Sequence, residues 1–118
     1  MDERARQALA DLVVFGEQAS RLVARGKEAW DTDEVNRLAG EAILHKAGEA
    51  VSRLERIDPD ILNAHPEVNW RGIKGARNIV AHRYHAVDYA ILWNALSDRL
   101  PHDIAAARSI LAQDGPLV

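Results

Sequence analysis

The residues of this chain that are best suited to chemistry lie in one octet, Arg77-Asn78-Ile79-Val80-Ala81-His82-Arg83-Tyr84. An arginine guanidinium presents a planar pair of N–H donors that matches two phosphate oxygens, and it stays charged at any working pH. A histidine imidazole, with an unperturbed pKa near 6.5, can take a proton from a ribose 2′-hydroxyl or return one to a leaving 5′-oxygen. Arg77 and His82 together therefore suit the cleavage of RNA through its 2′-hydroxyl. DNA lacks that hydroxyl and should not be cleaved.

A regular helix would distribute the polar side chains of the octet over more than one face. Arg77 and Tyr84 are seven residues apart and about 20° from alignment, with the small Ala81 on the same side. Asn78 and His82 are four apart, so the amide could hydrogen-bond the imidazole and select its tautomer. Arg77 and His82 stand roughly 140° apart around the helix, which is poor for direct contact. Either the helix loosens near His82, or both side chains converge on a third group such as a phosphate.

A single histidine in the motif leaves the acid–base pair incomplete, because in-line transfer needs a base on one side and an acid on the other. A two-fold dimer that places two copies of the motif face to face would supply both. His85 is the alternative within the chain, although we favour a solvated turn for it. The chain offers no convincing carboxylate cluster for a metal, which favours a metal-free route without a cofactor.

The charge distribution points to the same segment. The formal net charge is −3, yet no acidic residue falls between Glu67 and Asp88. An acid-free basic segment in an acidic protein indicates a local anion site, although a solvated helix face is an equally simple interpretation. On the first interpretation three cations of this segment bind RNA phosphates: Arg71, Lys74 and Arg83.

Apolar residues at steps of three and four predict helices throughout, and no strand-like alternation occurs. Trp30, Trp70 and Trp93 are expected to anchor a core or an interface. The fold expected is an antiparallel bundle of four to five helices. The first helix should cover residues 3–25, and the third should begin at 68–70 and end at 82–84. The second should bury a stripe formed by Val35, Leu38, Ala39, Ala42, Ile43, Ala47, Ala50, Val51 and Leu54. The fourth should begin at 87 and turn inward Ile91, Leu92, Ala95, Leu96 and Leu100.

Loops and breakers divide these helices. Residues 58–66 read as a loop with at most one turn, and Pro101 either kinks the fourth helix or opens a short fifth one. Gly40 and Gly48 lie inside the second helix, where each costs roughly 1 kcal/mol against alanine. We expect them to permit the close approach of a neighbouring helix.

Size and composition bound the class of protein. The 118 residues suggest one domain over 1–118. The absence of cysteine excludes disulfides and suits a reducing cytoplasm. No run of about 18 apolar residues occurs, so no membrane span is expected.

The octet resembles the signature of the HepT-like ribonuclease toxins of the HEPN superfamily: arginine, a polar residue, three more positions, histidine, any residue, tyrosine. Arg77 to Tyr84 matches it without a departure. Trp70-Arg71-Gly72-Ile73-Lys74-Gly75 is similar to the lead-in of that family, and Ala39-Gly40-Glu41-Ala42 resembles its second recurring patch. Further matches lie downstream at Val87-Asp88, Trp93 and Leu100-Pro101.

The resemblance implies a helical-bundle homodimer whose paired motifs line a cleft and cut RNA without metal. It makes Arg77 and His82 the catalytic pair, with Asn78 as a supporting polar neighbour. Many such proteins are neutralised by a minimal nucleotidyltransferase antitoxin in a type VII toxin–antitoxin system, which transfers AMP to the motif tyrosine, here Tyr84. The added bulk and negative charge would compete with the RNA phosphate beside Arg77.

Several alternatives stay open. Glu41 is either a buried polar group satisfied by a neighbour or a partner that supports the Arg77 site from behind without touching the substrate. The whole chain could instead be a non-catalytic helical module that binds a nucleotidyltransferase, or a plain dimerisation scaffold. Cleavage that depends on Arg77 and His82 would separate the first hypothesis from these two.

Overall fold

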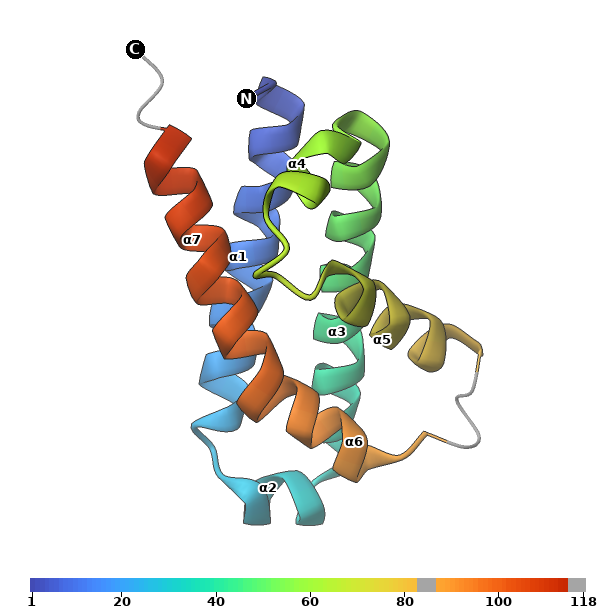
Figure 1. Cartoon of the computed structure of the whole chain (residues 1–118). Helices are drawn as coiled ribbons and strands as arrows, with labels where there is room; N and C mark the ends of the chain where they lie inside the picture. The colour runs from blue at the N-terminus through green and yellow to red at the C-terminus, as the bar shows by residue number, and fades with distance from the viewer. Residues whose placement is uncertain (83–86, 115–118) are drawn as a thin grey trace.

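Every regular element in the described part of the chain is a helix (Figure 1). The structure is a computed structural model, which describes the backbone of residues 1–82 and 87–114 and the side chains of residues 1–76 and 87–114. This confirms the predicted all-α bundle. The elements are α1 (Glu3–Val23), α2 (Lys27–Thr32), α3 (Glu34–Ile57), α4 (Pro59–Ala64), α5 (Trp70–His82), α6 (Tyr89–Asn94), the π-helical turn η1 (Ala95–Arg99) and α7 (Leu100–Asp114).

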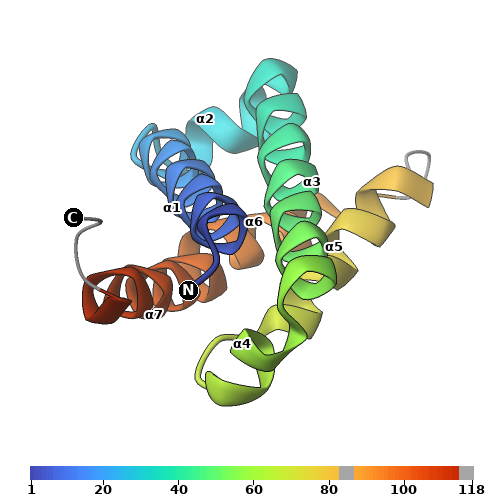
Figure 2. The same cartoon turned by 90° about the horizontal axis from the view of Figure 1, so that it is seen from above.

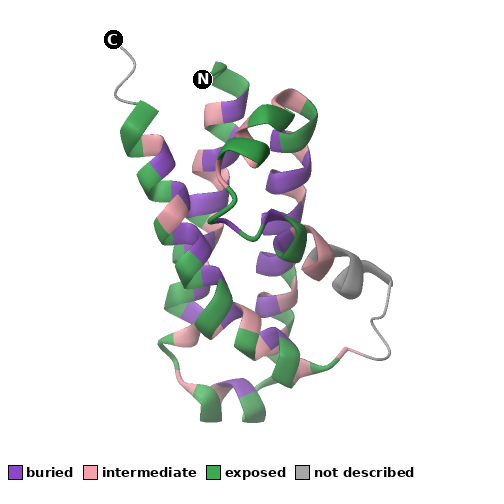
Figure 3. Ribbon diagram, viewed as in Figure 1, coloured by how far each residue is buried: buried purple, intermediate pink, exposed green. Residues whose placement is uncertain are grey.

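The helix α3 is the centre of the bundle. It runs antiparallel to α1, and in the view from above it lies between α1 and α5 (Figure 2). α7 packs against an adjoining side of α1 (Figure 2), while α5 crosses α3 obliquely and carries its C-terminal end away from α7 (Figure 1). The buried positions lie on the faces that α1, α3 and α7 turn towards one another (Figure 3). None of the described helices is both long and apolar enough to cross a bilayer.

The ends of the long helices follow the signals in the sequence. The carboxylate of Asp2 accepts a hydrogen bond from the backbone N–H of Arg4 at 2.7 Å and caps α1. Asp33 caps α3 in the same way, accepting from the N–H of Val35 at 3.0 Å. The first helix ends at Val23, two residues before the predicted end, and Gly26 then takes a φ of 98°. That value lies in the left-handed region, which favours glycine.

Two short helices were not predicted. α2 forms because Trp30 is buried, with 2% of its surface exposed, so this turn of chain is held against the core by tertiary contacts. α4 occupies much of the segment predicted as a loop with at most one turn, and Pro59 begins it at a position where a missing N–H costs nothing.

The prediction for the first turns of α3 was wrong. Val35 is 66% exposed and Leu38 52% exposed, and Ala42 is also exposed, whereas Asn36 and Gly40 are buried. Asn36 can lie inside because its amide donates to the Ala29 carbonyl at 3.0 Å and accepts from Arg25 at 3.0 Å. Ile91 in α6, expected inward, is likewise 54% exposed. The remaining apolar positions of both stripes are at least partly buried.

The helices α6, η1 and α7 form one continuous rod, which we call the C-terminal rod (Figure 1). The N–H of Leu100 donates to the carbonyl of Ala95, five residues back, as a π turn requires. Pro101 follows in the first turn of α7, so a helix does open there as in the second alternative, but α7 has 15 residues and continues the rod instead of forming a short separate helix. Its missing N–H and its ring disfavour an ordinary α turn just before it.

The glycine at position 40 permits a close approach, as predicted. A Cβ on Gly40 would lie 2.6 Å from two ring carbons of Trp30 and 3.0 Å from Cδ1 of Leu96. Both neighbours are at most 2% exposed and have no room to move aside. Gly40 therefore sets how closely α2 and the C-terminal rod approach α3.

We expect Gly40→Ala to lower the free energy of unfolding by about 1–3 kcal/mol, because the added methyl group overpacks the core around Trp30. Urea unfolding followed by circular dichroism measures this. Gly75→Ala in α5 is the matched control, since a Cβ there meets nothing within 4 Å. The control should raise stability by up to about 1 kcal/mol through helix propensity. A Gly40→Ala protein as stable as this control would contradict the packing described.

Candidate active site

The motif predicted from sequence begins on α5, whose last turns contain Arg77, Asn78 and His82. The helix continues regularly to His82, so it does not loosen before that residue. The backbone positions of Arg77 and His82 are therefore roughly 140° apart around the axis. The side chains of residues 77–82 and the whole of residues 83–86, with Arg83, Tyr84 and His85, lie outside the described residues.

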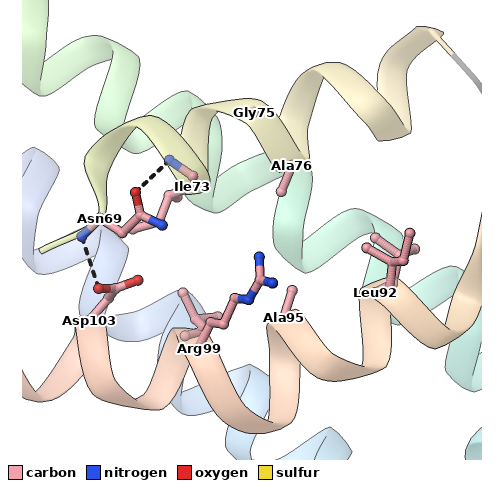
Figure 4. A pocket seen from close by; sticks show the side chains of 11 residues that line it. Asn69, Ile73, Gly75, Ala76, Leu92, Ala95, Arg99 and Asp103 are labelled. Carbon is pink, nitrogen blue, oxygen red and sulfur yellow. Dashed lines mark hydrogen bonds between the residues drawn. The ribbon is translucent and has the colours of Figure 1, made fainter.

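The start of α5 is fastened to α7. The backbone N–H of Asn69 donates to Oδ1 of Asp103 at 3.0 Å, and the side-chain oxygen of Asn69 accepts from the N–H of Gly72 at 3.0 Å (Figure 4). Asp103 is 4% exposed, so its charge is buried and used for this contact. The Trp70 indole adds a hydrogen bond to the carbonyl of His65 at 2.9 Å. These contacts fix the point from which the motif helix departs.

Two of the predicted phosphate-binding cations lie in the first turns of α5. Arg71 is exposed. Lys74 is half-buried, and its Nζ lies 2.7 Å from Oε1 of Glu55 on α3. The ion pair leaves Lys74 less available to an external phosphate than Arg71. A role of either residue in RNA binding stays a prediction.

The chain that follows the motif is held at α6 by a group that we call the Trp30 cluster: Trp30, Arg37, Glu41, Tyr89 and Trp93. The indole N–H of Trp30 donates to the carbonyl of Tyr89 at 3.1 Å. The Tyr89 ring meets Trp30 edge-on with centroids 6.2 Å apart, and the Arg37 guanidinium lies 5.4 Å from the Tyr89 centroid. The other side of Trp30 faces Trp93 at 5.5 Å. The cluster therefore joins α2, α3 and α6.

Glu41 belongs to this cluster. Its Oε2 accepts a hydrogen bond from the Tyr89 hydroxyl at 3.1 Å. Of the two interpretations of Glu41, this agrees with a polar group that is satisfied by a neighbouring side chain. A contact with Arg77 stays a prediction. Burial raises the pKa of Tyr89, and the hydrogen bond to Glu41 and its negative charge raise it further, while Arg37 opposes them.

Sequence reasoning missed Tyr89 and Asp103. Asp103 carried a signal, since it is a lone acid between the apolar residues Leu100 and Ile104 on a buried helix face. Tyr89 carried none, because its partner Glu41 is 48 residues away.

We expect Tyr89 to titrate above its ordinary pKa of 10.0. A raised tyrosine pKa stabilises the fold below that ordinary value, and the stabilisation is lost as the pH rises through the folded-state pKa. Alkaline difference absorbance in a Tyr84→Phe background isolates Tyr89, because the chain has 2 tyrosines. Glu41→Gln should lower the midpoint but leave it raised, since burial is the largest cause. Glu17→Gln on distant α1 should leave it unchanged; an equal midpoint for all three proteins would rule the contact out.

The chain was compared with known proteins. The profile of the family "Ribonuclease HepT-like" matches residues 15–110. Two proteins of Methanocaldococcus jannaschii and one of Caldanaerobacter subterraneus, each named "Putative RNase", are also similar. The first is 32% identical over 58% of this chain and 54% of its own length. The second is 31% identical over 56% and 61%, and the third 30% identical over 60% and 61%.

The matched segments span little more than half the length of these relatives. No solved structure is significantly similar to the chain. The family profile, in contrast, covers α3, α5, α6 and η1 completely, together with most of α7 and the C-terminal part of α1. The chain therefore belongs to the Ribonuclease HepT-like family.

Proposed function

We propose that this protein is a metal-independent endoribonuclease in which Arg77 and His82 perform the cleavage. The observation that supports the proposal most directly is the complete octet, which begins on α5 of a chain of the Ribonuclease HepT-like family. The names of the three relatives agree with it. The cysteine-free composition suits work in a reducing cytoplasm.

The reaction proposed uses the substrate's own 2′-hydroxyl. His82 takes the proton of that hydroxyl, and the 2′-oxygen attacks the adjacent phosphorus. The bond from phosphorus to the 5′-oxygen breaks, and an acid protonates this leaving oxygen. The products are a 2′,3′-cyclic phosphate and a 5′-hydroxyl. Arg77 stabilises the negative charge that develops on the phosphoryl oxygens, and Asn78 orients the His82 ring.

The acid is the part of the reaction that one motif does not supply. We propose that the protein works as a homodimer with two motifs facing one cleft, so that one His82 is the base and the partner's is the acid. Two anchors hold the two ends of the segment that contains the motif. Asp103 holds the start of α5, and the Trp30 cluster holds the start of α6.

We further propose that the protein is a toxin silenced by a nucleotidyltransferase antitoxin. The Tyr84 hydroxyl would attack the α-phosphate of ATP, which forms the tyrosyl–AMP bond and releases pyrophosphate. The attached phosphate brings negative charge to Tyr84, seven residues from Arg77 in the same motif, and so competes with the RNA phosphate. The resemblance of the octet to the HepT-like signature supports this proposal.

Purified protein should cleave single-stranded RNA in excess EDTA and leave 2′,3′-cyclic phosphate ends. Arg77→Ala and His82→Ala should each lower the rate at least about a hundredfold, because a positioned acid–base group is worth that much. Circular dichroism should show both variants folded. Arg108→Ala and His102→Ala on exposed positions of α7 are the matched controls and should keep the wild-type rate. Full activity of either motif variant would refute the assignment; an inert, unmodified wild type would favour a non-catalytic module that binds a nucleotidyltransferase.

A mixed-subunit experiment tests the dimer. If each cleavage needs a His82 from both subunits, co-expressing equal amounts of wild type and His82→Ala should leave roughly one quarter of the wild-type activity, because only one dimer in about four is fully intact. Independent sites would leave about one half. Sedimentation velocity on the same samples gives the oligomeric state, and a monomer that cleaves RNA would exclude the shared site.

Co-expression with a nucleotidyltransferase of the antitoxin class should add the mass of one AMP moiety per chain and abolish cleavage. Intact-mass spectrometry detects the addition. Tyr84→Phe should carry no added mass and should escape silencing, whereas Tyr89→Phe, whose hydroxyl is engaged by Glu41, should be modified like the wild type. Modification of Tyr84→Phe would show that another residue is the acceptor.

A further inference from the structure

A mostly apolar groove of about 280 Å³ separates α5 from the C-terminal rod (Figure 4). Ile73 and Ala76 line it from α5, and Leu92, Ala95 and Leu100 line it from the rod. A Cβ at Gly75 would meet nothing within 4 Å, so the α5 wall is open there. A slot with apolar walls of this size has room for a flat aromatic ring system.

The groove is also lined by two charged residues, Arg99 of η1 and the buried Asp103 of α7, and Arg99 is the cation. Its side chain is exposed, and the guanidinium reaches from the rod towards α5 (Figure 4). Within the part of the chain that the structure describes, Arg99 makes no ion pair, even with Asp103 four residues on, whose Oδ1 accepts from Asn69. The groove therefore presents a planar cation, without an ion-pair partner among the described residues, beside an apolar slot.

We infer that this groove binds an unpaired nucleotide of the RNA substrate, with Arg99 on its phosphate and the apolar walls against its base. A guanidinium fork matches phosphate oxygens, and splayed-out bases of single-stranded RNA are recognised through their faces. The inference rests on the proposed function for the identity of the substrate. It adds a nucleotide-binding subsite and a residue outside the motif.

The position of the groove fits a nucleotide close to the cleaved bond. α5 forms one wall, and the same helix continues from Ala76 to Arg77 and His82. Six residues of helix separate Ala76 from His82, which is about 9 Å along the axis. One RNA strand can therefore contact the groove and the motif together.

The size and charge of the groove favour a nucleotide over a second protein chain. Specific protein interfaces involve about 20–30 residues on each partner and exclude unpaired charges from their centre. This slot is lined by 11 residues, and the Arg99 guanidinium in its opening has no ion-pair partner among the residues that the structure describes. A phosphate compensates that charge, whereas an apolar helix face would leave it unpaired.

The test measures binding in the His82→Ala protein, so that the RNA stays intact. Fluorescence anisotropy with a fluorescein-labelled single-stranded RNA gives Kd for the background protein and for added Arg99→Gln. We expect Kd to rise roughly tenfold, as for one lost charge-assisted contact. The slope of log Kd against log salt should fall by about 0.7, the value for one phosphate on a single strand. Arg108→Gln, on the same rod but paired with Glu17, should change neither quantity.

A second variant tests the base contact. Ala95→Leu fills the slot without changing the charge of the protein. An abasic oligonucleotide of the same length removes the bases that the slot is proposed to bind. The background protein should bind the base-free strand less tightly than RNA. Ala95→Leu should bind both strands with similar Kd, while keeping the salt slope of the background protein.

The outcomes separate this inference from the proposed function. RNA cleavage by the wild type with equal Kd and salt slope for Arg99→Gln and Arg108→Gln overturns the subsite and leaves the ribonuclease standing. RNA binding that depends on Arg99, without any RNA cleavage by the wild type, keeps the subsite and overturns the ribonuclease. Absence of RNA binding overturns the inference. So does a change of oligomeric state in Arg99→Gln by sedimentation velocity, since the groove would then hold a second copy of the chain.

Discussion

The burial of the Trp30 indole is the contact on which the arrangement around the motif depends. Without it, the short helix α2 would have no reason to form, and α3 would need a larger residue than Gly40 to fill the core. The indole N–H also donates to the carbonyl of Tyr89. Trp30, which lies between α1 and α3 in the chain, therefore also binds the first residue of α6, the helix that follows the motif. One buried ring thus determines the position of three helices.

A division of labour follows from this arrangement. Two of the polar residues buried in the core, Asn36 and Asp103, bind backbone groups and serve the scaffold. The residues proposed for chemistry lie in one short segment between two fastened points, the start of α5 and the start of α6. The scaffold contacts thus fasten both ends of the segment that carries the proposed chemistry.

The sequence predicts the long elements well and the short ones poorly. α1, α3 and α5 are long enough for apolar periodicity to identify them, whereas α2 and α4 have six residues each and form only through tertiary contacts. Periodicity could not tell which of two neighbouring arcs of α3 is buried, because Val35 and Leu38 repeat as regularly as Asn36 and Gly40. For the site, residue types predict the chemistry of Arg77 and His82. Arg99 could not be found that way, since only the placement of α5 opposite the C-terminal rod gives it a groove to face (Figure 4).

The π turn between α6 and α7 has a further consequence. Leu92, Leu96, Leu100 and Ile104 are all buried, and they follow one another at steps of four. In an uninterrupted α-helix each such step overshoots a full turn by about 40°, and three would rotate the apolar line by about 120°. The wider turn η1 absorbs part of that rotation and keeps the line on one side of the rod. η1 thus keeps the apolar sides of α6 and α7 aligned. Removing one residue from η1 would turn α6 about the rod axis relative to α7, so the Trp30 cluster at α6 and the Asp103–Asn69 hydrogen bond at α7 could not both form.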